Sequence, residues 1–460
     1  MQIPLQKTDF VIKLLYILHL ENNMSHISKT VSITTLGCKV NQYESEALAE
    51  GLEACGYEIS SFDDTSFAYI INTCTVTAES DRKARQLIRR AIKKNPEAYI
   101  LVCGCFSQTS PDAVAKIEGV DYIAGTANKM SIIDALCRLD ARGKKNSEPE
   151  LCIPVLEDAE FERMCITKFE RTRAYVKIQD GCESRCTYCA IPGARGPVRS
   201  KAFSDVIDEV KLLTCGGCRE IVLTGIETGS YGRDLNGDES LASLLEEIDR
   251  IEGIGRIRLG SLDPAIIKPA FVEKIKPLKS LTHHFHLSLQ SGSDRILASM
   301  KRKYNSTQAM RAINLLRDAF DDLQLTTDVI VGFPGETDED FEKTCDLAKA
   351  AEFLMIHVFP YSKRAGTPAA SMKDQVDEQI KKARVSTLSK ISEDIRQKIL
   401  DSLIGSEHSV LFETYRDGFM YGHTREFIEV RVRADRDLHA EVRNVRLLSH
   451  DGLICEGELI

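Results

Sequence analysis

The sequence predicts an α/β chain in three parts: an N-terminal parallel α/β domain, an incomplete (β/α)6 barrel and a small C-terminal antiparallel β-barrel. One observation predicts the first two parts: short apolar runs of strand type alternate with amphipathic helical stretches, and this alternation favours parallel sheets covered by helices. A second observation predicts the last part, because polar and apolar residues alternate with a period of two near the C-terminus.

The predicted N-terminal domain spans residues 29–141. Its expected strands are Val31–Leu36, Phe67–Ile71 and Tyr99–Cys103, and residues 84–92 place apolar side chains on one helical face. The polar stretch at 141–150 is rich in turn-forming residues and is predicted to be a linker.

The barrel is predicted over residues 168–398 and the C-terminal domain over residues 401–460. Six strands are expected in the barrel, and a parallel barrel places its site at the carboxyl ends of its strands. The expected strands are Tyr175–Ile178, Glu220–Leu223, Arg256–Leu259, His284–Leu289, Asp328–Val331 and Met355–Phe359. In the C-terminal domain, alternating runs at 408–413, 427–432 and 442–447 separated by glycines predict a small closed barrel.

Bulk properties limit the class of protein. The chain has 460 residues, 43% of them hydrophobic, and a formal charge of −9, so nucleic acid would have to be held by local patches. Fifteen cysteines in so long a chain predict free thiols and a reducing cytoplasm rather than a disulfide scaffold. The apolar segment at 10–20 is interrupted by Lys13 and is too short to span a bilayer, so no membrane association is expected. No small-residue cleavage pattern follows it, and translation could begin at Met24, so residues 1–28 are excluded from the fold prediction.

The most informative motif is Cys182-Glu-Ser-Arg-Cys186-Thr-Tyr-Cys189. It directly follows the first predicted barrel strand, where a parallel barrel has its site. Three thiolates can bind three irons of a cubane cluster and leave the fourth iron without a protein ligand. The alternative is structural zinc, but such sites usually pair two cysteine clips or add histidines, and no histidine lies nearby.

A second set of cysteines follows the strands of the N-terminal domain. Cys38 and Cys74 each follow a predicted strand, and the third strand ends in Cys103-Gly104-Cys105. Because the carboxyl ends of parallel strands meet at one edge of a sheet, three thiolates could converge there and bind a second cluster. Spacing alone leaves open that these are ordinary buried cysteines, and it does not choose between Cys103 and Cys105.

Together these motifs resemble the methylthiotransferases, a family of radical S-adenosylmethionine (SAM) enzymes. The resemblance covers about residues 30–460 and implies, in order, a methylthiotransferase N-terminal domain, a radical SAM barrel and a TRAM domain. The string Leu36-Gly-Cys-Lys-Val-Asn-Gln-Tyr-Glu-Ser-Glu is similar to the branch that acts on threonylcarbamoyladenosine in tRNA. The isopentenyladenosine branch typically reads GCQMN here, and the branch that modifies a ribosomal-protein aspartate reads GCPKN.

The resemblance implies two [4Fe-4S] clusters and SAM as cofactors. The ligands would be Cys182, Cys186 and Cys189 in the barrel and Cys38, Cys74 and Cys105 in the first domain, since the family's third auxiliary ligand follows a glycine and precedes an aromatic residue. One electron from the barrel cluster would split SAM to methionine and a 5′-deoxyadenosyl radical, and a second SAM would donate the methyl group. The implied SAM contacts are Tyr188, Gly225, Glu227, Ser261, Gln290, Arg302 and Gly332. No protein acid or base is singled out as catalytic.

The implied activity is methylthiolation of C2 of N6-threonylcarbamoyladenosine at position 37 of tRNA. The alternatives are the same chemistry on isopentenyladenosine or on a ribosomal-protein aspartate, or a non-catalytic RNA-binding iron–sulfur protein. An electron donor and a sulfur source, unidentified by the sequence, would be further partners. Two features could contact RNA. One is a basic helix between Arg82 and Lys94. The other is a set of aromatic side chains in the C-terminal domain, Phe412, Tyr415, Phe419, Tyr421 and Phe427. The C-terminal domain nevertheless has seven arginines against eleven acidic residues, unlike a basic RNA-binding module.

Overall fold

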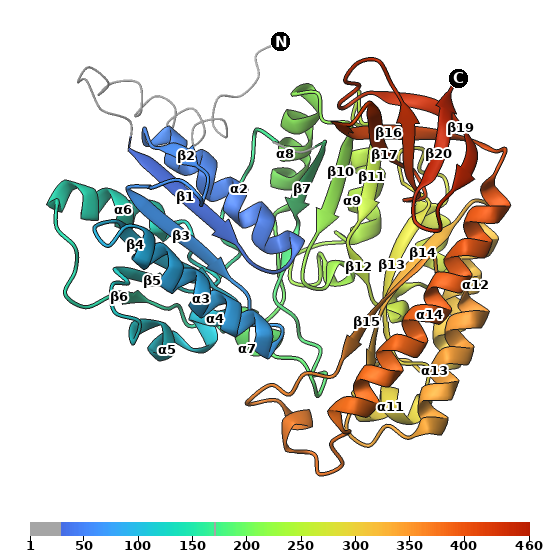
Figure 1. Cartoon of the computed structure of the whole chain (residues 1–460), viewed down its shortest axis with the longest axis horizontal. Coiled ribbons are helices and arrows are strands. Elements are labelled where there is room, and N and C mark those ends of the chain that lie inside the picture. The colour runs from blue at the N-terminus through green and yellow to red at the C-terminus, as the bar shows by residue number, and fades with distance from the viewer. Residues whose placement is uncertain (1–28, 170–171) are drawn as a thin grey trace. The chain divides into compact units, whose positions relative to one another are not determined.

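The computed structural model describes residues 29–169 and 172–460, so the apolar segment at 10–20 and Met24 lie outside the described residues (Figure 1). The chain divides into two compact units, one ending at Ile166 and the other beginning at Thr167. The predicted fold class is confirmed, with parallel α/β elements followed by a closed β-barrel. Among the described residues, no helix combines the length and the apolar character needed to cross a membrane.

The first unit is a six-stranded parallel sheet in the order β2-β1-β3-β4-β5-β6 with helices on both faces. Apolar side chains of α2 and α6 pack on one face, and those of α3, α4 and α5 pack on the other, as expected for a doubly covered parallel sheet. The elements are β1 (Thr30–Thr35), α2 (Lys39–Ala54), β2 (Glu58–Ser60), β3 (Ala68–Thr73), α3 (Ala78–Lys94), β4 (Tyr99–Gly104), α4 (Cys105–Thr109), α5 (Pro111–Ala115), β5 (Tyr122–Ala124), α6 (Ser131–Arg142) and β6 (Glu150–Cys152).

The polar stretch at 141–150, predicted to be a linker, is instead a connection inside this unit. Helix α6 ends at Arg142, and the chain returns to pair β6 in parallel with β5. Asn146 holds the connection in place, because its backbone and side-chain amides donate to the buried Asp121 at 3.2 and 3.1 Å. Turn-forming composition therefore marked a loop correctly but did not show that another strand follows it.

The second unit contains the predicted incomplete barrel. One parallel sheet has the order β11-β10-β7 and the other has the order β12-β13-β14-β15, and β12 continues the line of β11 after Gly260. The strands are β7 (Arg173–Lys177), β10 (Glu220–Thr224), β11 (Arg256–Leu259), β12 (Ser261–Leu262), β13 (His284–Gln290), β14 (Gln324–Val331) and β15 (Met355–Pro360). Strand β14 begins four residues before its predicted start at Asp328, because its polar start hid its strand character from the apolar pattern.

Helices follow these strands as the alternation predicts. They are α7 (Ile191–Arg195), α8 (Phe203–Cys215), α9 (Leu241–Asp249), α10 (Pro269–Ile275), α11 (Asp294–Ser299), α12 (Ser306–Ala319), α13 (Asp338–Ala351) and α14 (Glu378–Leu403). A short antiparallel pair, β8 (Gln179–Asp180) with β9 (Arg199–Ser200), lies just after β7 and flanks the cysteine loop. Short 3-10 turns occur at η1 (Thr228–Ser230), η2 (Pro264–Ile266) and η3 (Pro368–Ser371).

The C-terminal residues form a closed barrel in the order β16-β17-β18-β20-β19. Its strands are β16 (Glu407–Arg416), β17 (Phe419–Thr424), β18 (Glu429–Arg433), β19 (Val442–His450) and β20 (Cys455–Leu459). Two of the rings proposed to contact RNA are in the wrong place for that role. Phe412 is fully buried in the barrel core, and Phe427 lies in a turn at φ 72° with its ring stacked on His284 at 4.8 Å.

A buried ionic cluster joins this small barrel to the parallel barrel. Glu220 of β10 is fully buried and forms ion pairs with Arg258 at 2.7 Å, Arg173 at 3.0 Å and Arg256 at 3.7 Å. Arg173 also pairs with Glu413 of β16. Burial alone would raise the pKa of Glu220, but the guanidinium groups of Arg258 and Arg173 outweigh it and hold the pKa at about 2.

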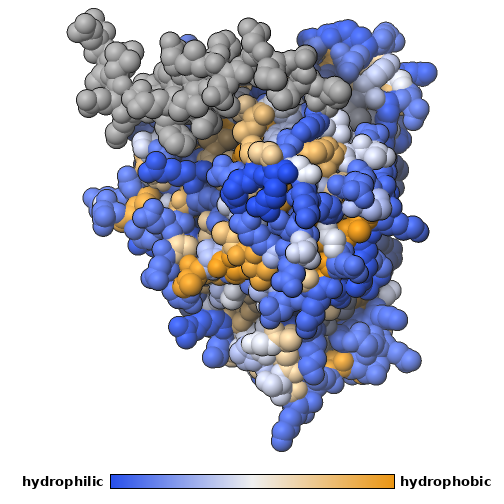
Figure 2. All heavy atoms as spheres, turned by 90° about the vertical axis from the view of Figure 1, so that its left-hand side faces the viewer, coloured by the Kyte–Doolittle hydropathy of each residue, from blue (hydrophilic) through white to orange (hydrophobic). Residues whose placement is uncertain are grey.

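The face of the chain in Figure 2 is largely hydrophilic, with apolar atoms in several separate groups rather than one continuous patch. Within the described part of the first unit, the large apolar side chains that are exposed are Val76, Leu151 and Val155. Single exposed apolar residues are normal on a protein surface, so this face does not indicate a large apolar docking site.

We predict that Glu220→Gln destabilises the second unit by about 3–5 kcal/mol, because removing one partner leaves three buried guanidinium groups without their shared carboxylate. Since the folded pKa lies below the ordinary 4.5, this stabilisation is complete above about pH 4.5 and is lost as the pH falls toward 2. Urea unfolding followed by far-UV circular dichroism measures the change. Glu247→Gln, which removes an exposed pair with Arg250, is the control and should have little effect. Equal stability of the two variants would contradict the prediction.

Candidate functional site

Three cysteines of the first unit follow three neighbouring strands of its sheet. Cys38 follows β1 at the start of α2, Cys74 follows β3, and Cys105 follows β4 at the start of α4. Their thiols lie near one another, as the pKa of Cys74 indicates: it is raised to about 11, mainly by burial and to a smaller extent by the charges of Cys105 and Cys38. Gly37 leaves room for this convergence, since a Cβ at that position would lie 2.8 Å from the Cys74 Sγ.

Asn41 ties two of these cysteine loops together. Its side-chain amide is fully buried and donates to the carbonyl of Leu36 at 2.7 Å and to that of Thr73 at 3.0 Å. Leu36 precedes Cys38 and Thr73 precedes Cys74, so one side chain fixes both loops. Asn72 returns the contact by donating to the Asn41 carbonyl at 3.0 Å.

A buried ion pair stabilises the asparagine network that holds the cysteine loops. The Lys129 ammonium is fully buried, forms an ion pair with the equally buried Glu44 and donates to the Asn72 Oδ1 at 3.0 Å. Buried ions are stable only when paired and hydrogen-bonded, and here every partner also belongs to the asparagine network. The packing of α2 and the α6 side of the sheet therefore positions the cysteine loops.

The structure separates the two candidate ligands at the end of β4. Cys103 is fully buried and belongs to the apolar core under α2 and α6. Gly104 then takes φ +101°, and a Cβ there would lie 2.4 Å from the Thr73 carbonyl oxygen, so glycine is required for this turn. The turn places Cys105 beside Cys74, whose pKa it influences. This geometry favours Cys105 as the ligand.

The cysteine loop of the second unit is held by backbone contacts along its length. Gly181 packs so tightly against the chain that a Cβ there would lie 1.7 Å from the Pro197 carbonyl oxygen, and Cys182 N–H donates to the Gly196 carbonyl at 3.0 Å. In the middle of the loop, the Thr187 hydroxyl donates to the carbonyl of Ser299 at 2.8 Å. The protein's own contacts therefore fix the loop at its start and in its middle.

The sulfur atoms of this loop lie among polar groups. The Cys182 thiol donates to Glu227 Oε2 at 3.2 Å, and Arg302 Nη1 donates to the Cys186 Sγ at 3.3 Å. Burial raises the pKa of Cys182 to about 12 and that of Cys189 to about 11. Thiolates are the metal-binding form, so metal loading of this loop must release protons.

Arg302 is the central cation of this region. Its Nη2 donates to Asp263 Oδ2 at 2.8 Å and to the Ser288 carbonyl at 2.9 Å, and its side chain is only 7% exposed. The sequence predicts that Arg302 pairs with the SAM carboxylate, whereas in the structure its guanidinium is already paired with Asp263. The predicted contact Ser261 lies beside this group, with its hydroxyl bonded to that of Ser288.

Two predicted SAM contacts follow β10 and are organised by Gln179. The backbone N–H of Glu227 donates to Gln179 Oε1 at 2.8 Å, and a Cβ on Gly225 would lie 2.8 Å from that same oxygen. Gln179 Nε2 in turn donates to the carbonyls of Asp180 and Gly181 at 2.7 Å. This one side chain therefore connects the loop after β10 to the start of the cysteine loop.

The remaining predicted contacts lie at other strand ends. Gln290 ends β13 at φ 71°, and Gly332 follows β14 at φ +70°. A Cβ on Gly332 would lie 2.1 Å from the Lys381 Cγ, so this glycine is already required by packing against α14. Tyr188 packs against an apolar cluster that includes Phe333.

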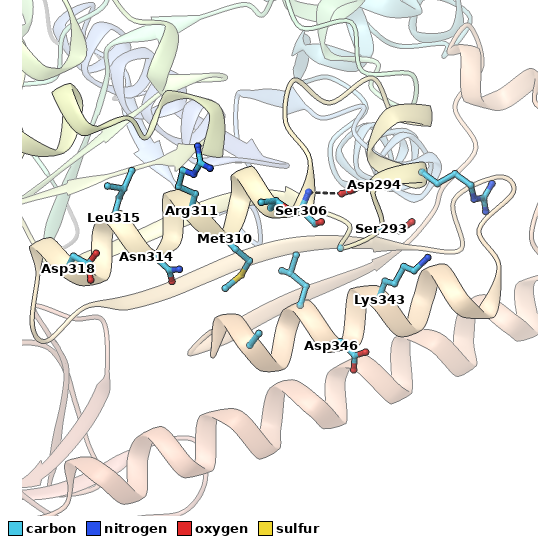
Figure 3. A pocket seen from close by; sticks show the side chains of 15 residues that line it. Ser293, Asp294, Ser306, Met310, Arg311, Asn314, Leu315, Asp318, Lys343 and Asp346 are labelled. Carbon is cyan, nitrogen blue, oxygen red and sulfur yellow. Dashed lines mark hydrogen bonds between the residues drawn. The ribbon is translucent and has the colours of Figure 1, made fainter.

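A groove of about 1090 Å³ lies on the outer helical layer, between α11, α12 and α13 (Figure 3). Its lining carries charges of both signs, such as Arg311, Asp318 and Lys343. None of its lining residues is a cysteine or a predicted SAM contact. The cysteines and the predicted SAM contacts therefore lie at the strand ends and not in this groove.

Each unit thus presents three cysteines at strand ends, and soft thiolates in sets of three fit cubane iron–sulfur clusters with one open iron. Comparison with known proteins agrees. The chain is 39% identical over 441 residues, 94% of its length and 96% of the relative's, to the threonylcarbamoyladenosine tRNA methylthiotransferase MtaB of Bacillus subtilis. It is also 39% identical to the protein of that name from Thermotoga maritima, covering 94% and 98% of the two chains. The chain belongs to the methylthiotransferase family of radical SAM enzymes.

Other matches give the extent of the family's domains. The family model described as the Radical SAM superfamily matches residues 176–348, and that described as "Uncharacterized protein family UPF0004" matches residues 30–125 of this methylthiotransferase. A tRNA-2-methylthio-N(6)-dimethylallyladenosine synthase of Acetivibrio thermocellus is 33% identical over 94% of this chain and 91% of its own. The radical SAM methyltransferase TsrM of Kitasatospora setae shares the fold, with TM-score 0.56 and 16% identity over 75% of this chain and 77% of its own.

Radical SAM methylthiotransferases use SAM and [4Fe-4S] clusters. Several contacts that shape these sites were not predicted from the sequence. Asp263 contacts Arg302, Gln179 contacts Glu227 and Lys129 contacts Asn72, and these partners lie 39, 48 and 57 positions away in the sequence. Contacts between such distant residues leave no local spacing pattern. Only their type was informative, since buried polar side chains must find partners.

We predict that Cys105→Ser removes about half of the iron from the reconstituted protein, whereas Cys103→Ser leaves the iron content unchanged. A serine at 105 replaces one thiolate of a three-thiolate set, while position 103 lies in the apolar core. Iron analysis after anaerobic reconstitution, together with electron paramagnetic resonance of the reduced protein, measures the difference. The opposite pattern would make Cys103 the ligand.

Proposed function

We propose that this enzyme transfers a methylthio group to C2 of N6-threonylcarbamoyladenosine at position 37 of tRNA. The observation that carries the proposal is the presence of a three-cysteine set at strand ends in each unit, in a chain 39% identical over nearly its whole length to enzymes named for this substrate. One cluster with an open iron can bind SAM, and a second open iron can bind the sulfur that is transferred.

The alternative substrate is isopentenyladenosine, which is the substrate class of relatives at 33–34% identity. The string Lys39-Val40-Asn41 favours the threonylcarbamoyl branch by resemblance. Val40 and Asn41 are buried, at 1% and 0% exposure, and Asn41 holds the cysteine loops. Val40 and Asn41 therefore support the framework, whereas Lys39 of the same string is exposed to solvent.

When bound, the clusters and SAM supply the one-electron chemistry and the sulfur and methyl transfer that the reaction needs. Cys182, Cys186 and Cys189 would hold one cluster, and Cys38, Cys74 and Cys105 the other. The protein's own groups orient these ligands. Arg302 donates to Cys186 from Nη1, to Asp263 and the Ser288 carbonyl from Nη2, and to the Tyr304 hydroxyl from Nε. The remaining Nη1–H is the donor that would be available to a SAM carboxylate.

Two surfaces are proposed to contact tRNA, one on helix α3 and one on the C-terminal barrel. Helix α3 carries seven cationic residues, of which Arg82 and Arg90 are paired with Glu79 and Asp63. On the C-terminal barrel most arginines are paired with acidic residues, but Arg416 makes no ion pair within the described chain and lies 4.2 Å from the centre of the Tyr421 ring. An arginine stacked on a half-exposed ring is a suitable platform for an unstacked base.

The reaction also requires an electron donor and a sulfur source, which we propose as partners of unassigned identity. Within the described residues no cysteine forms a disulfide, and six of the fifteen are proposed cluster ligands. Free thiols and iron–sulfur ligands are sensitive to oxidation, so we propose that the enzyme works in the reducing cytoplasm.

We predict that the purified, reconstituted enzyme with SAM, a reductant and a sulfide source methylthiolates only tRNA that bears the threonylcarbamoyl group. Mass spectrometry of nucleosides from the digested tRNA measures the product. The controls are the same tRNA without the modification and a tRNA bearing isopentenyladenosine. Equal product from unmodified tRNA, or product only from isopentenylated tRNA, would identify a different substrate.

We predict that Tyr421→Ala weakens tRNA binding about tenfold, because loss of one stacking ring typically costs about 1–3 kcal/mol. Iron content and SAM cleavage should not change, since Tyr421 lies on the C-terminal barrel and not among the cysteine loops. Fluorescence anisotropy with labelled tRNA at two salt concentrations measures binding. Arg250→Ala, an exposed arginine of α9, is the matched control, and equal affinity of both variants would exclude this ring from the RNA-binding surface.

A further inference from the structure

Three side chains outside the cysteine sets converge on the parallel barrel. His286 lies on β13, Asp328 on β14 and His357 on β15, and each offers one ligand atom within 4.8 Å of the other two. The strand register produces this convergence, because Asp328 pairs directly with His357, and His286 pairs with Thr326, two residues before Asp328 on the same face. No residue of this group has a part in the proposed reaction.

The spacing suits a single metal ion. His286 Nε2 lies 3.3 Å from Asp328 Oδ2, and two donor atoms that share one zinc ion at about 2.0–2.1 Å lie about 3.3 Å apart. The rings of His286 and His357 are 5.9 Å apart, centre to centre. The side chains are partly open to solvent, at 19% for His286 and 32% for Asp328, so an ion can enter.

A second contact orients the first histidine. His286 Nδ1 lies 2.9 Å from the Thr326 hydroxyl, which also lies 3.1 Å from His284 Nε2. When Nδ1 donates its proton to Thr326, the hydroxyl donates to His284, and the Nε2 of His286 presents a lone pair toward the Asp328 carboxylate. Two electron-rich atoms at 3.3 Å repel each other unless a cation or a proton lies between them. Metal-binding histidines usually have such a partner on the other ring nitrogen.

We propose that His286, Asp328 and His357 bind one divalent transition-metal ion of the zinc class, separate from both iron–sulfur clusters. Two imidazoles and one carboxylate are typical ligands of zinc, and three protein ligands leave a coordination position for water or another oxygen donor. The alternative is a plain hydrogen bond, in which Thr326 donates to His286 Nδ1 and the Nε2–H of His286 donates to Asp328. The two arrangements differ in whether the group binds a metal.

The test uses the full-length protein with both clusters reconstituted, so that the cysteines are occupied by iron. One equivalent of Zn²⁺ is added, unbound metal is removed, and zinc is measured by plasma mass spectrometry and by X-ray absorption at the zinc edge, to which iron does not contribute. We expect about one zinc per chain with nitrogen and oxygen ligands. His357→Ala and Asp328→Asn should each weaken zinc binding at least tenfold, and Thr326→Val about tenfold through loss of the orienting contact.

His283→Ala is the matched control, because His283 also pairs with a carboxylate, Asp322, yet lies on the surface without a third ligand. It should bind zinc as the unaltered protein does, with iron content equal in all variants. His357 is exposed, so its substitution should not impair folding. If another variant fails to fold, His357→Ala by itself tests the proposed metal site. Absence of bound zinc, zinc with sulfur ligands, or zinc retained by His357→Ala would each overturn the proposal.

Discussion

The hydrogen-bonded register of the parallel strands is the interaction on which both cysteine sets depend. In the first unit Thr35 pairs with Asn72 and Asn72 with Cys103, so three neighbouring strands end level with one another. In the second unit Thr224 of β10 pairs with Lys177 of β7, just before the cysteine loop. Cys38, Cys74 and Cys105 follow their strands by one to three residues, so the register alone brings them together, whereas Cys182 opens a longer loop five residues after β7. A shift of one residue would turn their neighbours to the opposite face of the sheet.

Two buried ionic networks fix the positions of side chains and segments that the strand register alone does not determine. The Lys129–Glu44 pair and the Glu220 cluster are both fully desolvated, and apolar residues of equal volume would often be as stable as such pairs. Stability alone therefore does not explain them. What they have in common is position, since Lys129 contacts the asparagines that hold two cysteine loops, and Glu220 gathers arginines that reach the C-terminal barrel. The charged groups of an ion pair must lie within a narrow range of distances. Each network therefore constrains the separation of the segments it joins more than apolar packing would.

The sequence predicts the parts of this molecule that are encoded locally. Apolar runs identified the core strands, and the close spacing of Cys182, Cys186 and Cys189 identified a cluster loop. Strand β17 was missed because Gly422 interrupts it, yet a Cβ there would lie 2.3 Å from the Leu411 carbonyl oxygen, so the barrel requires that glycine. Partners that arrive from distant segments, such as Asp263 for Arg302, could not be predicted, because their pairing depends on the folded topology.

The inner column of β13 shows how one strand can serve several purposes. His284, His286 and Ser288 alternate with Phe285, Leu287 and Leu289, so these polar side chains share one face. Each meets a different neighbour: His284 stacks on Phe427 of the small barrel, His286 meets Asp328, and the Ser288 hydroxyl bonds to that of Ser261 while its backbone carbonyl accepts from Arg302. A polar column of this kind is tolerated only where every member has a partner. The same register that buries the leucines therefore also connects the small barrel, the histidine–aspartate group and the arginine beside the cysteine loop.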